Sequence, residues 1–496
     1  MSELGSFIKR LRDIMRNDAG INGDAQRIEQ IAWMLFLRVY DAKEDDWEMD
    51  EENYESIIPE ECRWRNWAHD DGSGSAMTGD DLLEFVNNKL FPTLKNLTVS
   101  PQTPIKKAIV KTTFEDTNQY MKDGVLLRQV LNVIDDVDFS DYKESHTFGQ
   151  IYEEILKELQ SAGSAGEFYT PRAVTDFMAQ MINPQIGEQV ADFACGTGGF
   201  LTSWMKQLQP KIRTTEDQEA FGKSIYGIEK KQFPYMLCVT NMLLHELDVP
   251  KIYHDNSLLR DVLDYTEEDK FDVILMNPPY GGSEKASVKQ HFPADLASSE
   301  TADLFMAVIM YRLKDTGRAA VILPDGFLFG NDNAKVNLKK KLIKEFNLHT
   351  IIRMPGSVFS PYTSITTNIL FFDKSKATED VWFYRMDMPE GYKHFSKTKP
   401  MKLEHFDPVV EWWNNRVEIA DEKDDESITE TWKAKKYTAG EIEADDYNLD
   451  LCGFPQEEKV ILSPEETIKN FIAKRDELDR KMDAKLQEIL DLLGVE

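Results

Sequence analysis

The residues with the clearest chemical potential stand where an apolar run ends. Residues 272–276 (DVILM) have the composition of a buried parallel strand, and they are followed directly by Asn277, Pro278, Pro279 and Tyr280. The two prolines fix their own φ angles, donate no backbone hydrogen bond and hold the preceding residues extended. We therefore expect a stiff corner that presents the Asn277 side-chain oxygen, the Pro278 carbonyl and an aromatic ring.

This corner suits chemistry on an amino nitrogen that is conjugated to an aromatic ring. Such a nitrogen is a poor nucleophile because its lone pair is delocalised. Two acceptors on its N–H bonds would localise the lone pair while Tyr280 stacks on the ring, so neither a metal nor a strong base is required. The alternative is a strand that merely ends in a proline-rich turn, but Asn-Pro-Pro-Tyr/Phe is expected by chance in fewer than about one in a hundred such chains.

A glycine-rich turn follows a second apolar run, in the stretch DFACGTGGF. Glycines there allow a tight turn and a close approach of the backbone to a ligand. The phosphate-loop pattern G-x-x-x-x-G-K-[ST] is absent, and no glycine stands three residues after Gly198, as the dinucleotide fingerprint requires. Taken alone, the turn is weak evidence for a nucleotide site. The candidate residues in it are Asp192, Gly196, Thr197, Gly198 and Gly199.

Two acidic residues end the next two expected strands. Glu229, in IYGIEK, stands where a carboxylate can accept hydrogen bonds from both ribose hydroxyls, and Asp255, in HDNS, stands where a base amino group could be recognised. A ribose and adenine site without a phosphate cradle favours a nucleoside that carries no phosphates. S-adenosylmethionine fits that description.

The composition limits the class of protein. The chain has 496 residues, 41% of them hydrophobic, and a net charge of −30. Its four cysteines lie far apart and its histidines form no H-E-x-x-H cluster, so no disulfide framework and no metal site are expected. No apolar run reaches membrane-spanning length and no signal peptide is evident, which predicts a soluble, cytoplasmic protein without membrane association. The negative charge opposes autonomous nucleic-acid binding and favours dependence on a partner.

Three regions are expected along the chain. Residues 1–145 are predicted to be mostly helical, with a long helix carrying Ile28, Ile31, Leu35 and Val39 at helical spacing. Residues 146–373 are predicted to form the catalytic domain, because apolar strands alternate with helices there, which is typical of a parallel, doubly wound α/β sheet. Residues 374–496 are again acidic and end in an amphipathic helix.

The sequence resembles the γ-ordered amino-methyltransferases, and most closely the modification (M) subunit of type I restriction–modification systems, which methylates adenine N6 in DNA. The resemblance rests on DFACGTGGF, NPPY and GEFYTPR, and extends through ILPDGFLF, RMPGSVFSPYTSITTNILFF and DDYNLD. It covers most of the chain. Phe193 stands where many members have proline, a backbone detail that leaves the assignment intact.

The resemblance implies a Rossmann-like class I S-adenosylmethionine-dependent methyltransferase sheet with an N-terminal helical domain and a C-terminal helical tail. It also implies that Asn277 to Tyr280 are catalytic and that the glycine turn and Glu229 hold the cofactor. In this family the segment before the first catalytic-domain helix lies across the methionine part of the cofactor. In this sequence that segment is Glu167, Phe168, Tyr169, Thr170, Pro171 and Arg172.

The same resemblance implies partners. Type I M subunits take target recognition from a separate specificity (S) subunit, with two M chains per S chain, and act on double-stranded DNA, in some complexes with a restriction (R) subunit. The acidic tail lacks the basic patch of an autonomous enzyme, and the one dense basic run, at 339–344, is as compatible with a solvated helix face as with a phosphate contact. The capped helix expected from Ser463 to Leu493 could dock on a partner or pack on its own domain.

Two other functions remain open from the residues alone. A methyltransferase acting on protein glutamine or on RNA could use the same corner, because those nitrogens are also planar. A non-catalytic scaffold is opposed by the intact Asn277 to Tyr280 motif.

Overall fold

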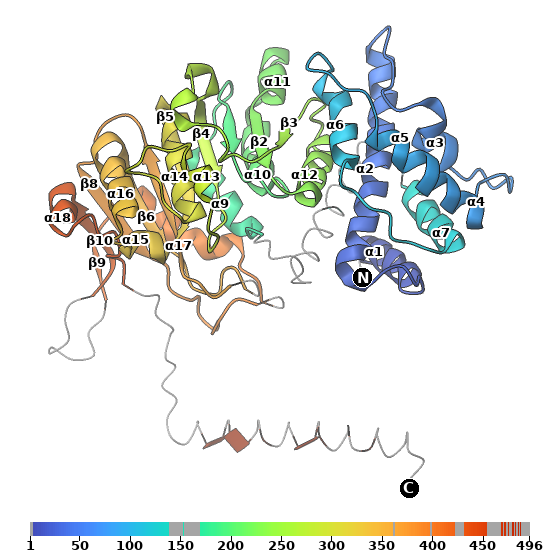
Figure 1. The fold of residues 1–496 in the computed structure, drawn as a ribbon. Helices are drawn as coiled ribbons and strands as arrows, with labels where there is room; N and C mark the ends of the chain where they lie inside the picture. The colour runs from blue at the N-terminus through green and yellow to red at the C-terminus, as the bar shows by residue number, and fades with distance from the viewer. Residues whose placement is uncertain are drawn as a thin grey trace. The chain divides into compact units, whose positions relative to one another are not determined.

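The computed structural model describes residues 3–137, 152, 169–360, 363–396, 399–421 and 431–453, with single positions between 468 and 487. Residues 388–393 and 456–496 form a contact unit separate from the remainder. Figure 1 shows the elements in chain order. Glu167 and Phe168, two of the predicted cofactor-binding residues, lie outside the described residues.

The described helices are α1 (Glu3–Met15), α2 (Gly23–Asp50), α3 (Trp64–Trp67), α4 (Gly79–Glu84), α5 (Phe91–Lys95), α6 (Ile105–Phe114), α7 (Gly124–Asp135), α9 (Arg172–Ile182), α10 (Gly199–Leu208), α11 (Thr215–Gly222), α12 (Gln232–Leu244), α13 (Ala286–Lys289), α14 (Thr301–Arg312), α15 (Asp325–Phe329), α16 (Asn333–Glu345), α17 (Asp407–Asn414) and α18 (Ala439–Ala444). The described strands are β1 (Val190–Asp192), β2 (Ile225–Glu229), β3 (Lys251–His254), β4 (Phe271–Met276), β5 (Leu313–Pro324), β6 (Asn347–Arg353), β7 (Thr367–Asp373), β8 (Asp380–Arg385), β9 (Ile419–Ala420) and β10 (Trp432–Thr438).

The N-terminal region is helical, as predicted, and α2 is its central helix. The four apolar residues that predicted this helix are all buried. Its middle is buried on every side because aromatic side chains from later helices pack around it: the Trp33 ring meets Phe91 edge-on at 5.1 Å, and Phe36 lies 6.2 Å from Phe114. The apolar character of the helix on all faces is therefore explained by burial.

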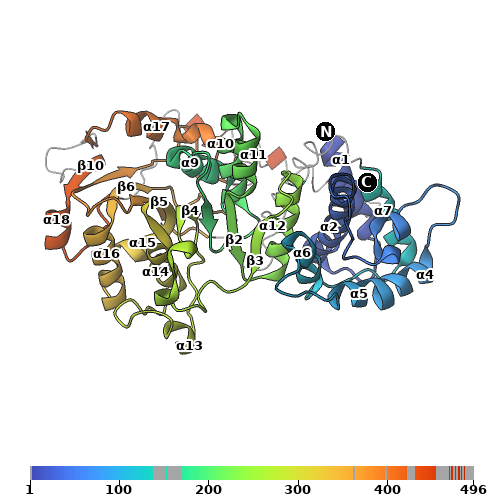
Figure 2. The same cartoon turned by 90° about the horizontal axis from the view of Figure 1, so that it is seen from above.

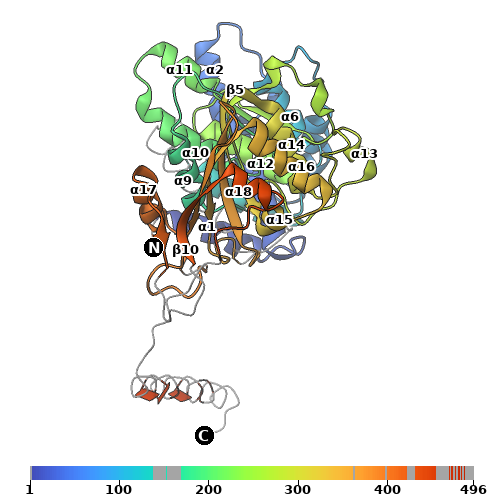
Figure 3. The same ribbon diagram turned by 90° about the vertical axis from the view of Figure 1, so that its left-hand side faces the viewer.

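The rest of the described chain is built on a ten-stranded sheet with the order β3-β2-β1-β4-β5-β7-β6-β8-β10-β9. The strands β3, β2, β1, β4 and β5 run parallel to one another. Helices α9, α10 and α17 lie on one face of the sheet, and α14 and α16 lie on the other (Figures 2 and 3). The α/β class with helices on both faces is confirmed.

The prediction of a wholly parallel sheet is wrong in its second half. Strand β7 pairs antiparallel with both β5 and β6, and β10 pairs antiparallel with β8 and β9. A parallel pair needs a long crossover, usually through a helix, whereas an antiparallel pair can follow a simple return of the chain. No helix is described among residues 354–366 that could carry the chain from β6 back across the sheet, so β7 returns beside β6.

The sheet continues beyond residue 373. The segment 146–373, which we expected to form the catalytic domain, contains β1 to β7, and β8, β9 and β10 follow it in the same sheet. The division at residues 145 and 373 stays a prediction.

Helix α12 connects the sheet to the helical region. The Gln232 side chain at its N-terminus donates from Nε2 to the carbonyls of Thr112 and Thr113, at 2.6 and 2.7 Å. The Tyr152 hydroxyl donates to the Leu237 carbonyl at 2.9 Å. These contacts hold the helix that begins directly after the end of β2.

A buried arginine ties the late DDYNLD segment to the carboxyl ends of the central strands. Arg353, the last residue of β6, has no exposed side-chain surface. Its guanidinium pairs with Asp325 at 3.1 Å and with Asp450, and it donates from Nε to the Asn368 side chain at 3.1 Å. Because an unpaired buried charge is costly, this network fixes the segment around Asp450 to the same edge of the sheet as the predicted site.

None of the helices in the described part of the chain combines the length and the apolar character that crossing a bilayer requires.

Candidate functional site

The carboxyl ends of β1 to β4 open into one cavity of about 660 Å³. This position and size are typical of small-molecule sites in open α/β sheets, which measure roughly 300–1,000 Å³. The cavity brings together most of the residues predicted from sequence. Those that line it are Tyr169, Thr170, Arg172, Asp192, Gly196, Thr197, Gly199, Glu229, Asp255, Asn277, Pro278, Pro279 and Tyr280.

Two described candidates do not line the cavity. Pro171 is the residue before α9 and starts that helix. Gly198 starts α10 with a left-handed φ of 83°, and a Cβ at this position would lie 2.9 Å from the Cys238 sulfur. Glycine is therefore required there by backbone conformation and by close packing. These two residues shape the segments that carry their neighbours.

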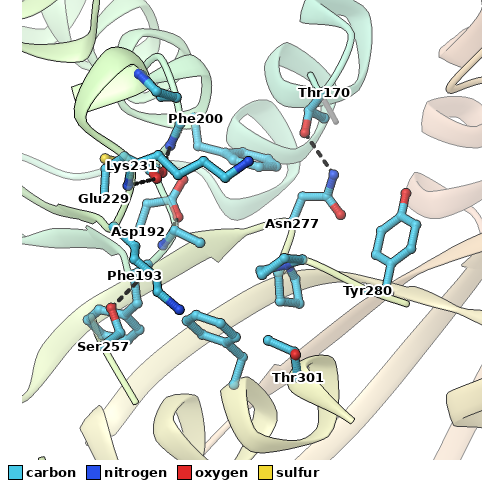
Figure 4. Close-up of a pocket in the computed structure, with 18 of the residues that line it drawn as sticks. Thr170, Asp192, Phe193, Phe200, Glu229, Lys231, Ser257, Asn277, Tyr280 and Thr301 are labelled. Carbon is cyan, nitrogen blue, oxygen red and sulfur yellow. Dashed lines mark hydrogen bonds between the residues drawn. The ribbon is translucent and has the colours of Figure 1, made fainter. Parts of the chain in front are cut away.

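Asn277 is held by one end of its amide. Its Nδ2 donates to the Thr170 hydroxyl oxygen at 3.0 Å, as Figure 4 shows. Its Oδ1 is buried, and no donor among the described residues satisfies it. A buried acceptor without a donor costs about 1–3 kcal/mol, so this oxygen is available to accept a hydrogen bond.

Tyr280 forms the other side of this corner. Its side chain is only 7% exposed, and its ring meets Phe359 edge-on at a centroid distance of 6.5 Å. Burial raises the pKa of the Tyr280 phenol above its ordinary value, and the neighbouring Asn277 side chain offsets part of that shift. The phenol is therefore neutral and its ring is held in place by packing.

A pair of carboxyl groups lies on the opposite side of the cavity. Glu229 accepts hydrogen bonds from the backbone N–H groups of Gly196 and Lys231, at 2.9 and 2.8 Å. Asp192 is almost fully buried and accepts from the Ala194 N–H at 3.0 Å. In Figure 4 these acidic groups lie together, apart from the corner with Asn277 and Tyr280.

The pKa of Asp192 is raised to about 8: burial is the main cause, the hydrogen bond from the Ala194 N–H lowers it in part, and the nearby charge of Glu229 raises it. Asp192 therefore holds its proton in the folded protein at pH values where an exposed aspartate has lost it. The Asp192 carboxyl group is therefore protonated near neutral pH.

This shift predicts a pH dependence of stability. The ordinary aspartate pKa is about 4, and the pKa of Asp192 in the folded protein is about 8. Between these two pH values the folded state binds a proton that the unfolded chain has released. The contribution of Asp192 to the free energy of unfolding therefore decreases as pH rises. Asp192→Asn keeps an acceptor for the Ala194 N–H but cannot ionise. Urea unfolding should show that the free energy of unfolding of the variant, relative to that of the wild type, is higher at about pH 8.5 than at about pH 5.

The matched control is Asp295→Asn, which changes an exposed aspartate. It should not alter the pH profile. A stability difference between Asp192→Asn and the wild type that stays constant across this range would contradict the buried, protonated Asp192.

Sequence reasoning missed part of the lining. Several missed residues lie beside predicted ones in sequence and could have been found by that proximity. Thr301 and Phe305 come from α14, and Ile365 comes from the loop before β7; these three had no local signal. The other missed residues are Thr175, Phe193, Ala194, Cys195, Phe200, Lys230, Lys231, Pro234, Asn256, Ser257, Leu258, Gly281, Gly282 and Glu284.

The basic run at 339–344 is not an open phosphate-binding patch. The Lys339 ammonium is buried and donates to the carbonyls of Leu328 and Gly330, at 2.9 and 2.8 Å. Lys341 pairs with Glu345, and Lys344 pairs with Glu443. Most of this charge is therefore used within the fold.

Comparisons with known proteins agree along the whole chain. The N-6 DNA methylase family profile matches residues 143–460, and the HsdM N-terminal domain profile matches residues 4–134. The type I restriction enzyme EcoEI methylase subunit of Escherichia coli is 47% identical over 493 residues, which cover 99% of this chain and 98% of the relative.

Two solved structures give the same picture. A crystal structure of a modification subunit assigned to a type I restriction enzyme from Vibrio vulnificus YJ016 has a TM-score of 0.76 and 39% identity, over 88% of this chain and 92% of that one. A chain from work on complex assembly and conformational transition of the type I restriction–modification system has a TM-score of 0.79 and 33% identity, over 99% and 98%. The resemblance inferred from the motifs is confirmed, and the chain belongs to the N-6 DNA methylase family, among the methylase subunits of type I restriction enzymes.

Proposed function

We propose that this chain transfers a methyl group from S-adenosylmethionine to N6 of adenine in double-stranded DNA, at a target chosen by a separate specificity subunit. The observation that carries this proposal is the corner at the end of β4. There the Asn277 side-chain oxygen is a buried acceptor that no donor among the described residues satisfies, beside a rigid aromatic ring.

The residues of this corner account for the reaction on the adenine side. One N6 hydrogen would donate to Asn277 Oδ1 and the other to the Pro278 carbonyl, which localises the nitrogen lone pair. Tyr280 would stack on the base and fix its plane. Bound S-adenosylmethionine would supply a methyl group on a positively charged sulfur; the N6–carbon bond would form as the sulfur–carbon bond broke, and N6 would lose a proton to solvent. The base must leave the duplex to reach Asn277.

The opposite side of the cavity fits an adenosyl group without phosphates. The Glu229 carboxylate binds two backbone N–H groups and has further lone-pair positions for ribose hydroxyls. Asp255 is exposed at the lining, with one oxygen accepting from the Asn256 N–H at 2.7 Å, and its other oxygen could receive a base amino group. Tyr169 and Arg172 would hold the methionine end.

Replacing Glu229 tests the cofactor site. Glu229→Ala is expected to weaken S-adenosylmethionine binding by about 1.5–3 kcal/mol, the range for hydrogen bonds to a charged group. Titration calorimetry measures this directly, and Glu219→Ala, which removes an exposed glutamate of α11, is the matched control. Unchanged affinity would move the site elsewhere, and comparable binding of NAD would overturn the choice of cofactor.

The partners follow from family membership and from the tail. The described positions between 468 and 487 are helical, and their apolar side chains Ile468, Phe471, Ile472 and Met482 are exposed. A helix with an uncovered apolar stripe suits docking on a partner helix. We expect the partner to be the S subunit, with two M chains per S chain, and a restriction subunit to join in some assemblies. Action on DNA implies a cytoplasmic protein.

Labelled S-adenosylmethionine distinguishes the proposed substrate from the alternatives. The chain copurified with its S subunit should label duplex DNA, and digestion should yield N6-methyladenine at one sequence. Labelling of protein or RNA, with none in DNA, would favour an amino-methyltransferase of another class.

A further inference from the structure

Thr170 and Asn277 are 107 residues apart, yet their side chains meet in the cavity. The segment that carries Thr170 crosses from the glycine turn to the catalytic corner. At one end, a Cβ on Gly199 would lie 2.7 Å from the Arg172 guanidinium, so this arginine packs directly on the turn. At the other end, the Thr170 oxygen accepts from Asn277 Nδ2 at 3.0 Å (Figure 4).

An asparagine amide has a donor end and an acceptor end of nearly equal size. Only the oxygen can accept a hydrogen bond from an adenine amino group. An amide rotated by half a turn would instead direct its own N–H groups toward the N–H groups of the adenine. Thr170 gives the Nδ2 end a partner, whereas Oδ1 has none in the part of the chain that the structure describes. If Thr170 lacked its oxygen, Nδ2 would have to find its hydrogen bond by turning toward the cavity, and Oδ1 would leave its place.

We infer that Thr170 is a positioning residue for the catalytic amide. Its hydroxyl oxygen accepts from Nδ2 and holds the orientation in which Asn277 presents an acceptor to the target base. The inference rests on the proposed function, because it assigns Thr170 a role in that reaction. The segment from Thr170 to Arg172 contacts both the glycine turn and Asn277, so one short segment positions residues on both sides of the cavity.

The test compares Thr170→Val, which keeps the shape and removes the oxygen, with Thr170→Ser, which keeps the oxygen. Both are measured as the full complex with the S subunit and its target DNA, by single-turnover methylation and by S-adenosylmethionine binding. Thr170→Val should lower the methylation rate by about 10- to 100-fold, the scale of a misplaced catalytic group, with cofactor and DNA affinities within about threefold of wild type. Thr170→Ser should restore the rate to within about threefold.

A double-mutant cycle with Asn277→Ala shows whether Thr170 acts through the amide. Thr170→Val should change the residual rate of Asn277→Ala by less than about twofold, since the group that it orients is gone. Equal losses in both backgrounds, or a rate loss explained by weaker cofactor binding, would overturn the inference. If Asn277→Ala itself methylates normally, the proposed function fails instead, so the two failures are distinct.

Discussion

Asn277→Ala is expected to lower the rate of adenine methylation by at least about a hundredfold, the scale on which a preorganised catalytic contact is lost. The alanine removes the side-chain acceptor and leaves only the Pro278 carbonyl to bind the N6 hydrogens. The nitrogen lone pair then stays delocalised over the base. Single-turnover transfer from labelled S-adenosylmethionine, with the complete complex, measures the chemical step apart from binding.

Cofactor affinity should change little in the same variant, because Asn277 lies across the cavity from Asp192 and Glu229 (Figure 4). Asn88→Ala, at an exposed position in the helical region, is the matched control and should behave as wild type. Transfer by Asn277→Ala within a few-fold of wild type would defeat the assignment of the corner. A parallel loss of cofactor binding would indicate a collapsed site.

The isolated chain is expected to bind S-adenosylmethionine and yet to have negligible sequence-specific affinity for DNA. A protein with a net charge of −30 is repelled by the phosphate backbone unless clustered basic side chains compensate. The densest basic run does not compensate, since Lys339, Lys341 and Lys344 are bonded within the fold. Adding the S subunit should restore both DNA binding and methylation, which a gel-shift assay and mapping of N6-methyladenine would measure.

Removing the tail separates assembly from cofactor binding. Deletion of residues 463–496 should weaken association with the S subunit, measured by copurification, and leave the calorimetric affinity for S-adenosylmethionine intact. Site-specific methylation of duplex DNA by the purified chain alone would refute the dependence on a partner. Full assembly of the truncated chain would place the docking surface elsewhere.

The amino-acid sequence by itself determined the class of the fold and most of the candidate site. The conformation of residues 272–280 is determined by the local sequence, because an apolar run favours a strand and the two prolines end it. Glu229 ends β2 and Asp255 follows β3, and because these strands lie side by side in a parallel arrangement, the carboxyl ends of the two strands share an edge of the sheet. The long helix α2 was equally predictable, since its apolar spacing is local.

Only the tertiary structure decided which distant side chains meet. The antiparallel insertion of β7 depends on how the chain returns after β6, and no local pattern records that choice. The burial of Lys339 depends on two carbonyls that α16 meets only after folding. The contact of Thr170 with Asn277 joins residues on two segments that are separate until the sheet and α9 pack together. Such contacts are set by packing between elements, whereas strand ends and glycine turns are set by the residues that compose them.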